Sequence, residues 1–447
     1  MDLVALKLVD TGLQFVSPRG KMSRPSPGLA LIDGRELAVG LDAERSARLN
    51  PRRLHTRFWQ DLGTAPLGRP FPGYLRTADL AHAHLKTVWE ADGGNAEEVI
   101  VAVPGIFSDD QLALFLGIAR ELGIRVRGLI DAAIAAAVDR ELQASVLHLD
   151  IHLHRAVLTE LEHGQEIVRK SVRTEPRVGL LALRDAWTRV IAQTFVRATR
   201  FDPLHVAATE QVLYAQLANY LDVLTEKDST EVRIASGGRQ HTVELDRTRI
   251  IDAALSTYDT LSSLVNDHEH LNDTTLLLSH RAAALPGLVD HLEEHTESSV
   301  VVLHPAAAAS GALAHADRIR STDPALPFIT RLPGLDARPP GPVTIPVTPP
   351  RDGDRHLPTH LVVNGVAHRI ESEFLVLGPA GIVEQADLDQ PNASVRWLAG
   401  QAVLDAPAGA SVTVNGDPID GRTTLAPGDR LRLGEADFEV LVVAIAG

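Results

Sequence analysis

The sequence has no cysteine, which excludes disulfides, thiol nucleophiles and cysteine-ligated zinc or iron–sulfur centres. Aromatic residues make up only 4% of the 447 residues, and basic residues are not in excess: 43 Lys and Arg stand against 58 Asp and Glu, a net charge of −15 with His neutral. Nucleic-acid binding uses a basic surface and aromatic stacking platforms. We therefore expect no nucleic-acid partner.

Long apolar runs are also missing. Even Val440 to Ala446, which no other apolar run exceeds in length, falls far short of the ~20 residues with which a helix crosses a bilayer. No charged and then apolar leader opens the sequence. We therefore expect a cytoplasmic protein without membrane insertion. The apolar share of 45% and the charged share of 23% are ordinary for a folded globular chain, and at ~100–200 residues per domain this length predicts several domains.

Proline divides the chain. Ten prolines fall between Pro324 and Pro358, and because proline lacks an amide donor and fixes φ, this stretch is predicted to be neither helix nor central strand. We interpret residues 321–358 as an extended linker between a body, residues 1–320, and a tail, residues 359–447. Within the linker, LPFITRLPGL is apolar enough to lie on a neighbouring surface.

The body alternates between predicted strands and helices. Residues 99–105 form an apolar run stopped by Pro-Gly, as expected of a buried strand. Ser108 then offers a helix N-cap, and residues 111–122 carry apolar side chains at helical spacing until Gly123. Further helices are predicted at about 180–199, 209–224 and 247–266. This alternation predicts an α/β fold, and no internal repeat is visible.

The tail has a different pattern. From residue 360 onward, short apolar segments are separated by Gly, Asp, Asn and Pro about every 8–12 residues, without helical periodicity. This pattern predicts a small all-β sandwich.

One predicted strand of the body carries metal-binding residue types. His148, Asp150, His152 and His154 alternate with period two and would share one face of a strand. Neighbours two apart on a strand lie ~7 Å from each other, so a single ion could contact at most two of them. We expect a polar face that lines a cleft, and no metal site.

The only local basic cluster consists of Arg45, Arg48, Arg52, Arg53 and Arg57. We interpret it as an exposed helical face. If the cluster does bind a partner, the net negative charge of the chain suits an acidic protein surface better than DNA.

Several segments of the body agree, in order and spacing, with one known family. VIVAVPGIFSDDQLALFLGIARELG, LHLDIHLHRAV and TLLLSHRAAALPGLVDHLEEH resemble the nucleotide-binding domain of DnaK-type heat-shock chaperones, in the actin-like ATPase superfamily. The resemblance implies an α/β two-lobed actin-like ATPase fold around a deep ATP cleft. Lobe I would comprise about residues 1–143 plus 304–320, and lobe II about residues 144–303.

The phosphate-binding hairpins of that family are altered here. The first survives in part as Asp10-Thr11-Gly12. The second, Asp-Leu-Gly-Gly-Gly-Thr in the chaperones, reads Asp150-Ile151-His152-Leu153-His154-Arg155, with bulky side chains where glycines let phosphates approach the backbone. The resemblance leaves Asp10, Gly12 and Asp150 as vestigial nucleotide-binding residues.

Other functional positions of the family are lost as well. The carboxylate that acts on magnesium and water has become Ala132, the adenosine loop reads Ser279-His280-Arg281 without its glycines, and no lysine lies near Phe58-Trp59. Each loss of a catalytic positioning group lowers the rate about 10²–10³-fold. We expect a pseudo-ATPase with no catalytic residues and no cofactor.

The tail resembles a forkhead-associated (FHA) domain, a β-sandwich that reads phosphothreonine, through SVTVNGDPIDGRTTLAPGDRLRLGEADFEVLVV. The phosphate-reading Arg of that family is Pro379 here, and its Ser-x-x-His step reads Ser394-Val395-Arg396-Trp397. Ser394, Arg396 and Asn415 are the vestigial phosphopeptide-binding candidates, although Asn-Gly is also ordinary turn chemistry.

The sequence thus predicts a non-catalytic scaffold or adaptor that acts through protein partners and takes no small-molecule substrate. A pseudo-ATPase body and a degenerate FHA tail would be joined by a Pro-rich spacer, whose reach sets the effective concentration of bound partners. Two alternatives remain open: a divergent ATP-binding chaperone-like switch, and a phosphothreonine-peptide reader acting through the tail.

Overall fold

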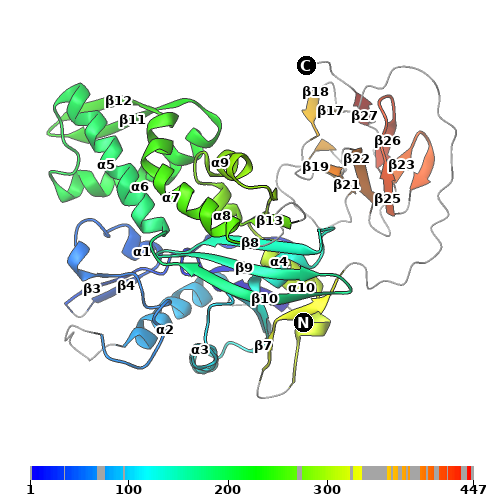
Figure 1. The fold of residues 1–447 in the computed structure, drawn as a ribbon, viewed down its shortest axis with the longest axis horizontal. Coiled ribbons are helices and arrows are strands. Elements are labelled where there is room, and N and C mark those ends of the chain that lie inside the picture. Colours follow the sequence, from blue (N-terminus) through cyan, green and yellow to red (C-terminus); the bar gives the residue numbers. More distant parts are fainter. Residues whose placement is uncertain are drawn as a thin grey trace. The chain divides into compact units, whose positions relative to one another are not determined.

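The computed structural model describes residues 3–334 apart from 35, 68–75, 94–95, 269–273 and 323–325. In the C-terminal part it describes 360–363, 366–370, 375–378, 381–382, 393–398, 401–406, 412–419, 421–433 and 440–443. The chain divides into two compact units, residues 1–341 and 342–447. The first unit is α/β, and the second is built of antiparallel strands (Figure 1). Residues 335–358 of the predicted linker lie outside the described residues.

The first sheet has the strand order β15-β7-β6-β1-β2. Strand β1 (Leu3–Lys7) pairs antiparallel with β2 (Gln14–Val16) and parallel with β6 (Glu98–Val103), which pairs parallel with β7 (Val126–Asp131). Helix α3 (Asp109–Glu121) connects β6 to β7. All six residues of β6 are buried, which confirms the strand predicted from its apolar run.

Helix α3 follows its local sequence signals. The Ser108 side chain accepts a hydrogen bond from the Gln111 N–H at 3.2 Å, and Gln111 returns its side chain to the Ser108 N–H, which together form a capping box. The helix buries Leu112 and Phe115, and Gly123 follows with φ of 73°. The predicted cap, helix and terminating glycine are confirmed.

The second sheet has the order β14-β13-β8-β9-β10-β16. Its strands are β8 (Ser145–Ile151), β9 (Ala156–His163), β10 (Glu166–Glu175), β13 (Thr274–Leu278) and β14 (Ser299–Val302). Strand β8 pairs antiparallel with β9 and parallel with β13, which pairs parallel with β14. Strands β8, β9, β13 and β14 therefore pair with one another in the same pattern as strands β1, β2, β6 and β7. The fold therefore contains a topological repeat that the sequence does not display.

Two alanine-rich helices extend the repeat and pack against each other. Helix α4 (Ala132–Ala137) follows β7, and α10 (Ala307–Ala314) follows β14. They share a core cluster with Ile100 of β6 and Leu277 of β13, so they contribute to the packing between the two sheets. A Cβ atom on Gly311 would lie 1.8 Å from the Ala135 carbonyl oxygen, so only glycine permits this close contact.

The remaining helices and strands of the first unit lie outside the two main sheets and helices α4 and α10 (Figure 1). The predicted long helices are confirmed as α5 (Leu180–Thr199), α6 (Ala207–Glu226) and α7 (Arg247–Asn266), while the hairpin β11 (Ser229–Ser236) and β12 (Arg239–Asp246) was not predicted. The remaining elements are β3 (Ala30–Asp33), β4 (Glu36–Val39), α1 (Leu41–Glu44), η1 (Pro51–Arg53), β5 (Leu54–His55), α2 (Thr77–Val88), η2 (Trp89–Gly93), α8 (His280–Ala283), α9 (Leu288–His295) and α11 (Ala316–Ile319).

Part of the predicted linker is built into the body. Strand β15 (Phe328–Ile329) pairs parallel with β7, and β16 (Arg331–Pro333) pairs antiparallel with β10. Residues 328–333 therefore join one edge of each main sheet, and we call them the strap. Prolines are tolerated at such edges because the outer side of an edge strand makes no ladder bonds. The expectation that this apolar stretch lies on a neighbouring surface is confirmed for the strap.

The second unit consists of two antiparallel sheets with the orders β18-β17-β27-β26-β23-β24 and β20-β19-β21-β22-β25. Both sheets contribute to one core cluster, including Leu361 and Val440 from the first sheet and Val395 and Leu404 from the second. The strands are β17 (His360–Val363), β18 (Val366–Arg369), β19 (Leu375–Gly378), β20 (Gly381–Ile382), β21 (Ala393–Leu398), β22 (Gln401–Ala406), β23 (Val412–Val414), β24 (Asp417–Ile419), β25 (Gly421–Thr424), β26 (Arg430–Leu433) and β27 (Val440–Val443).

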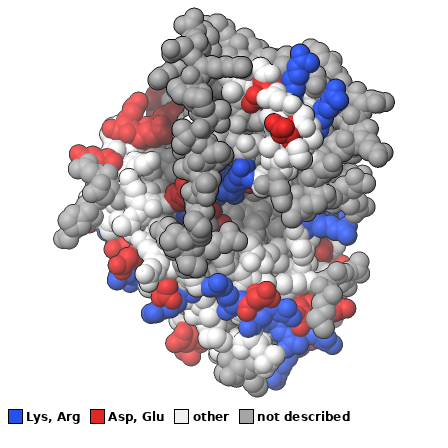
Figure 2. Space-filling view, turned by 90° about the vertical axis from the view of Figure 1, so that its right-hand side faces the viewer, with Lys and Arg blue, Asp and Glu red and all other residues white. Residues whose placement is uncertain are grey.

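The surface carries charges of both signs. On the face drawn in Figure 2, Lys and Arg gather in the lower part but lie among Asp and Glu side chains. In the part of the chain that the structure describes, no helix combines the length and the apolar character with which a segment crosses a bilayer.

Two helical glycines provide a matched test of the α4–α10 contact. We expect Gly311→Ala to lower the free energy of unfolding by about 1–3 kcal/mol, because the added methyl group forces the two helices apart. Gly117→Ala, in α3, meets no atom within 4 Å and is expected to raise it by about 0.5–1 kcal/mol. Urea denaturation of both variants measures the difference, and equal effects would contradict the packing argument.

Candidate functional site

The candidate site of the first unit lies where the turn after β1 meets the turn after β8. Asp10, in the first turn, is only 6% exposed. Its Oδ1 accepts a hydrogen bond from the Leu153 N–H at 3.1 Å and lies 3.2 Å from His152 Nδ1. Burial raises the pKa of Asp10, but His152 and the Leu153 N–H favour the carboxylate, and the net pKa lies below its usual value. One carboxylate oxygen thus joins the two turns.

The second turn comprises residues 152–155. Strand β8 ends at Ile151, and the His152 N–H donates to the Arg155 carbonyl at 2.8 Å. The prediction that four alternating side chains share one strand face is therefore wrong, because His152 and His154 lie in the turn. His154 points elsewhere: its Nε2 lies 2.8 Å from Thr56 Oγ1.

The bulky residues of this turn are buried. His152 is 3% exposed and Leu153 is 1% exposed. Leu153 packs in a cluster with Leu29, Leu31 and Ala43, from the β3 and α1 region. The side chains that stand where the resembled family has glycines thus fill the space between the second turn and this region.

Gly12 has a structural reason of its own. A Cβ atom at this position would lie 2.8 Å from the Cβ of Pro25, so the first turn needs glycine in order to pack on the following segment. In the resembled family this glycine lets a phosphate approach the backbone. Here the close neighbour of Gly12 is the side chain of Pro25.

Asp150 lies in a second group of charges, inside β8. Burial raises its pKa, but the positive charges of Arg281 and Lys7 outweigh burial and hold the pKa well below its usual range. Burial, together with the charge of Arg281, lowers the pKa of Lys7 to about 8, against the opposing effect of Asp150. Burial also lowers the pKa of His148 to about 4. At neutral pH His148 is therefore uncharged, and the charges of Arg281 and Lys7 favour the carboxylate form of Asp150.

Asp131 carries a third buried carboxylate, at the start of α4. Its Oδ1 accepts from the N–H groups of Ala133 at 2.8 Å and Ile134 at 3.4 Å, and its Oδ2 accepts from Arg169 Nη1 of β10 at 2.7 Å. Burial raises the pKa of Asp131, and the bond to Arg169 offsets part of that rise. The Arg169 guanidinium also lies 5.2 Å from the ring centre of Phe328 in the strap.

The space around these groups is small. One cavity beside Lys7, Ala133 and Asp150 has a volume of about 20 Å³, and a neighbouring one beside Ser279 has the same volume. A third, of about 10 Å³, is lined by Gln60 and Arg155, whose Oε1 and Nε atoms are buried without another partner among the described residues. Each cavity has room for about one water molecule, whereas small-molecule sites measure ~300–1,000 Å³. These residues do not fit a triphosphate with its Mg²⁺.

Metal-binding residue types are not gathered either. Within the described ranges, no three His, Asp or Glu side chains are arranged to hold a metal ion.

The candidates of the second unit lie in different sheets. Ser394 and Arg396 are two apart on β21, on the face opposite the buried Val395. Asn415 lies in the β23–β24 turn with φ of 55°; its Nδ2 donates to Asp429 Oδ1 at 2.8 Å, and its Oδ1 accepts from the Arg430 N–H at 3.0 Å. Asn415 thus holds its own turn. Pro379 lies outside the described residues.

Much of the predicted arginine cluster is used within the chain. Arg48 pairs with Asp185 and with Glu210, and its guanidinium lies 4.3 Å from the Tyr214 ring centre. Arg45 pairs with Asp42, and Arg53 with Asp33.

The sequence matches no protein-family model. Residue types alone did not single out Lys7 and Arg169 as members of the interior charge groups. For Lys7 the sequence does offer a signal, because this lysine ends the apolar strand Leu3–Lys7 and so lies next to the core. Lysine is almost never fully buried unless it is paired, so a lysine in that place indicates a nearby acid. Arg169 gives no comparable local signal.

The Asp131–Arg169 pair provides a test of the interior charges. Arg169→Met leaves a fully buried carboxylate without its cation, so we expect the free energy of unfolding to fall by about 3–5 kcal/mol. Lys170→Met, next in sequence, breaks an exposed pair with Glu162 and is expected to change stability little. Urea denaturation compares the two, and an equally small effect of Arg169→Met would show that the buried pair contributes little.

Proposed function

We propose that this protein is a non-catalytic scaffold or adaptor. Its first unit would be an actin-like ATPase fold, related to the DnaK-type chaperone domain, whose nucleotide cleft is closed. Its second unit would be a degenerate FHA domain. The observation that carries the proposal is the direct contact, through the Asp10 carboxylate, between the two turns that correspond to the phosphate hairpins.

The repeated sheet topology supports the fold assignment. In the first sheet, β1 pairs antiparallel with β2 on one side and parallel with β6 on the other, and β6 pairs parallel with β7. In the second sheet, β8 pairs in the same way with β9 and β13, and β13 pairs parallel with β14. The helix after each last strand packs against its counterpart, α4 against α10. A duplicated sheet with a turn of each half facing the other is the arrangement that the resemblance implies.

The interior chemistry supports the absence of hydrolysis. A phosphoryl-transfer site keeps its acids free for metal ions and water and its backbone open to phosphate oxygens. Here Asp10 accepts from the Leu153 N–H of the second turn, Asp131 accepts from Arg169, and Asp150 accepts from the Ile151 N–H. These groups would have to break their existing interactions before they could serve a nucleotide.

A scaffold function suits the two-unit organisation. Residues 1–341 and 342–447 are separate compact units, and the proline-rich sequence between the strap and the second unit favours an extended spacer. Partners bound to the two units would be held at an effective concentration set by the length of that spacer.

The alternative, an ATP-binding switch, makes opposite predictions for Asp10. Isothermal calorimetry of the full chain with ATP–Mg²⁺ is expected to show no micromolar binding, and a phosphate-release assay no turnover.

Asp10→Ala is expected to lower the free energy of unfolding by about 1–3 kcal/mol, because the buried Leu153 N–H loses its acceptor.

Asp42→Ala, which removes an exposed carboxylate, is the control and is expected to change stability little. Micromolar ATP binding with turnover in the wild type, abolished by Asp10→Ala without loss of stability, would establish the switch instead.

The phosphopeptide-reader alternative is tested on the second unit within the full chain. Because Asn415 is occupied by Asp429 and Arg430, we expect a phosphothreonine peptide library to bind no more tightly than its unphosphorylated counterpart, and Arg396→Ala to change nothing. Phosphate-dependent binding that Arg396→Ala removes would identify a functional reader.

A further inference from the structure

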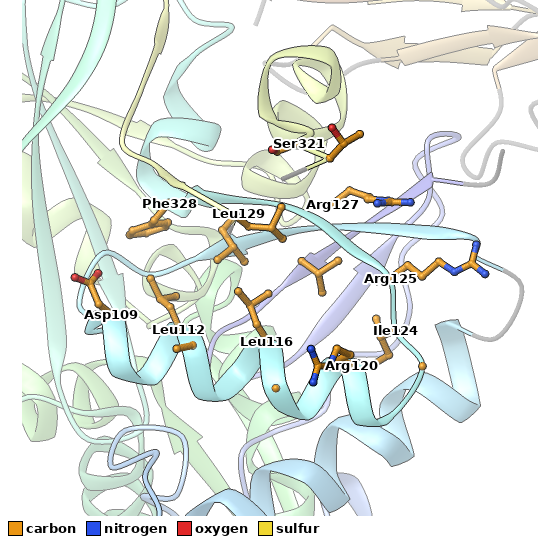
Figure 3. Close-up of a pocket in the computed structure, with 16 residues that line it drawn as sticks. Asp109, Leu112, Leu116, Arg120, Ile124, Arg125, Arg127, Leu129, Ser321 and Phe328 are labelled. Carbon is orange, nitrogen blue, oxygen red and sulfur yellow. The ribbon is translucent and has the colours of Figure 1, made fainter. Parts of the chain in front are cut away.

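A wide hollow of the first unit lies away from the interior charges. A groove of about 1030 Å³ lies between α3 and β7, and Phe328 of the strap is among its lining residues (Figure 3). Its floor is apolar: Leu112 and Leu116 of α3, Leu129 of β7 and Phe328 of the strap line it. A volume of this size is at the upper end of the range for binding sites.

The rim of the groove is basic at one end. Arg120, Arg125 and Arg127 line the end near the C-terminus of α3, whereas Asp109, the only acid among the described residues that line the groove, lies at the other end (Figure 3). Arg127 is paired with Glu98 at 2.9 Å. Arg120 and Arg125 are exposed and have no acidic partner in the part of the chain that the structure describes. The groove therefore complements a ligand that is apolar along its length and acidic at one end.

The backbone geometry selects the form of that ligand. An extended peptide would need a free strand edge, but β7 is already bonded by the strap at Leu129 and Ile130, and its Arg127 carbonyl accepts from the Ser321 N–H at 2.8 Å. Along α3, by contrast, Ala113 and Gly117 are exposed, and a Cβ on Gly117 would meet no atom within 4 Å. Small residues one helical turn apart let a second helix approach closely.

We propose that this groove binds an acidic amphipathic helix of a partner protein. From Asp109 to Arg120 the α3 wall is about 17 Å long, enough for roughly three turns of a bound helix. Apolar side chains at positions i, i+4 and i+7 of that helix contact the floor, and Asp or Glu side chains at one end pair with Arg120 and Arg125. This surface is the first unit's docking site in the scaffold function proposed above, on which the inference rests.

The test uses a displayed library of random 16-residue peptides, selected on the full chain. Enriched peptides are expected to combine helical apolar spacing with an acidic end. In fluorescence anisotropy, their affinity is expected to fall at least tenfold in Arg120→Glu/Arg125→Glu and in Gly117→Tyr, which fills the groove. Arg239→Glu, at an exposed arginine of β12 outside the groove, is the control and is expected to bind as the wild type does.

Urea denaturation establishes that the variants remain folded. Enrichment of basic or uncharged peptides, no enrichment at all, or equal binding to wild type and groove variants would overturn the proposal. Light scattering adds one more outcome: a dimer that Arg120→Glu/Arg125→Glu dissociates would assign the groove to a second copy of the chain and overturn it as well. Because ATP turnover is measured separately, a failed groove and a failed pseudo-ATPase proposal give different results.

Discussion

The buried carboxylate of Asp10 is the constraint on which the arrangement of the first unit depends. An ionised carboxylate removed from water costs several kcal/mol unless donors and positive charge replace its hydration. Asp10 obtains polar contacts from the other half of the unit: the Leu153 N–H donates to its Oδ1, which also lies 3.2 Å from His152 Nδ1. Moving the halves apart would leave this charge unpaired and would withdraw Leu153 from its apolar cluster, so electrostatics and packing favour the same closed state.

The other interior acids obey the same rule. Asp131, at the end of β7, accepts from Arg169 of β10, so this ion pair fixes the relative position of two parts of the fold. Asp150 accepts from the Ile151 N–H, and the positive charges of Arg281 and Lys7 lower its pKa. The strap adds a backbone connection, since residues 328–333 bond to both main sheets. The closed interior is therefore a property of several independent contacts, and a ligand would have to replace all of them.

The features that the sequence predicts correctly are those with local causes. The capping box at Ser108, the apolar run of β6 and the helical spacing of α5 and α7 depend on neighbouring residues alone. The β11–β12 hairpin was missed although it has a local signal, because alternating strands flank the Gly237–Gly238 dipeptide. The turn at residues 152–155 has no such signal, because it holds no Gly or Pro and the polar–apolar alternation of β8 continues through it.

The site was harder to predict than the fold for a physical reason. Asp10 and Asp150 could be named from the sequence, but their partners could not. The contact to Leu153 uses a backbone N–H, which every residue other than proline has, and it spans 143 positions. The pairing of Asp131 with Arg169 depends on where α4 and β10 meet. Such contacts follow from the tertiary arrangement, and no local pattern encodes them.

The charged side chains of the interior and of the surface differ in whether they already have partners within the chain, and this decides which of them can bind another molecule. Inside the first unit, acids and cations bind each other, and within the arginine cluster near α1 residues such as Arg48 are paired with acids of the same chain. Pairs already made must be broken before a partner can use them, so they contribute little net affinity. Arg120 and Arg125 carry no such cost within the described residues, and they border an apolar floor. A partner that binds there would gain new ion pairs and bury apolar surface at once, which is why we propose this groove, and not the filled interior, as the surface that recognises another protein.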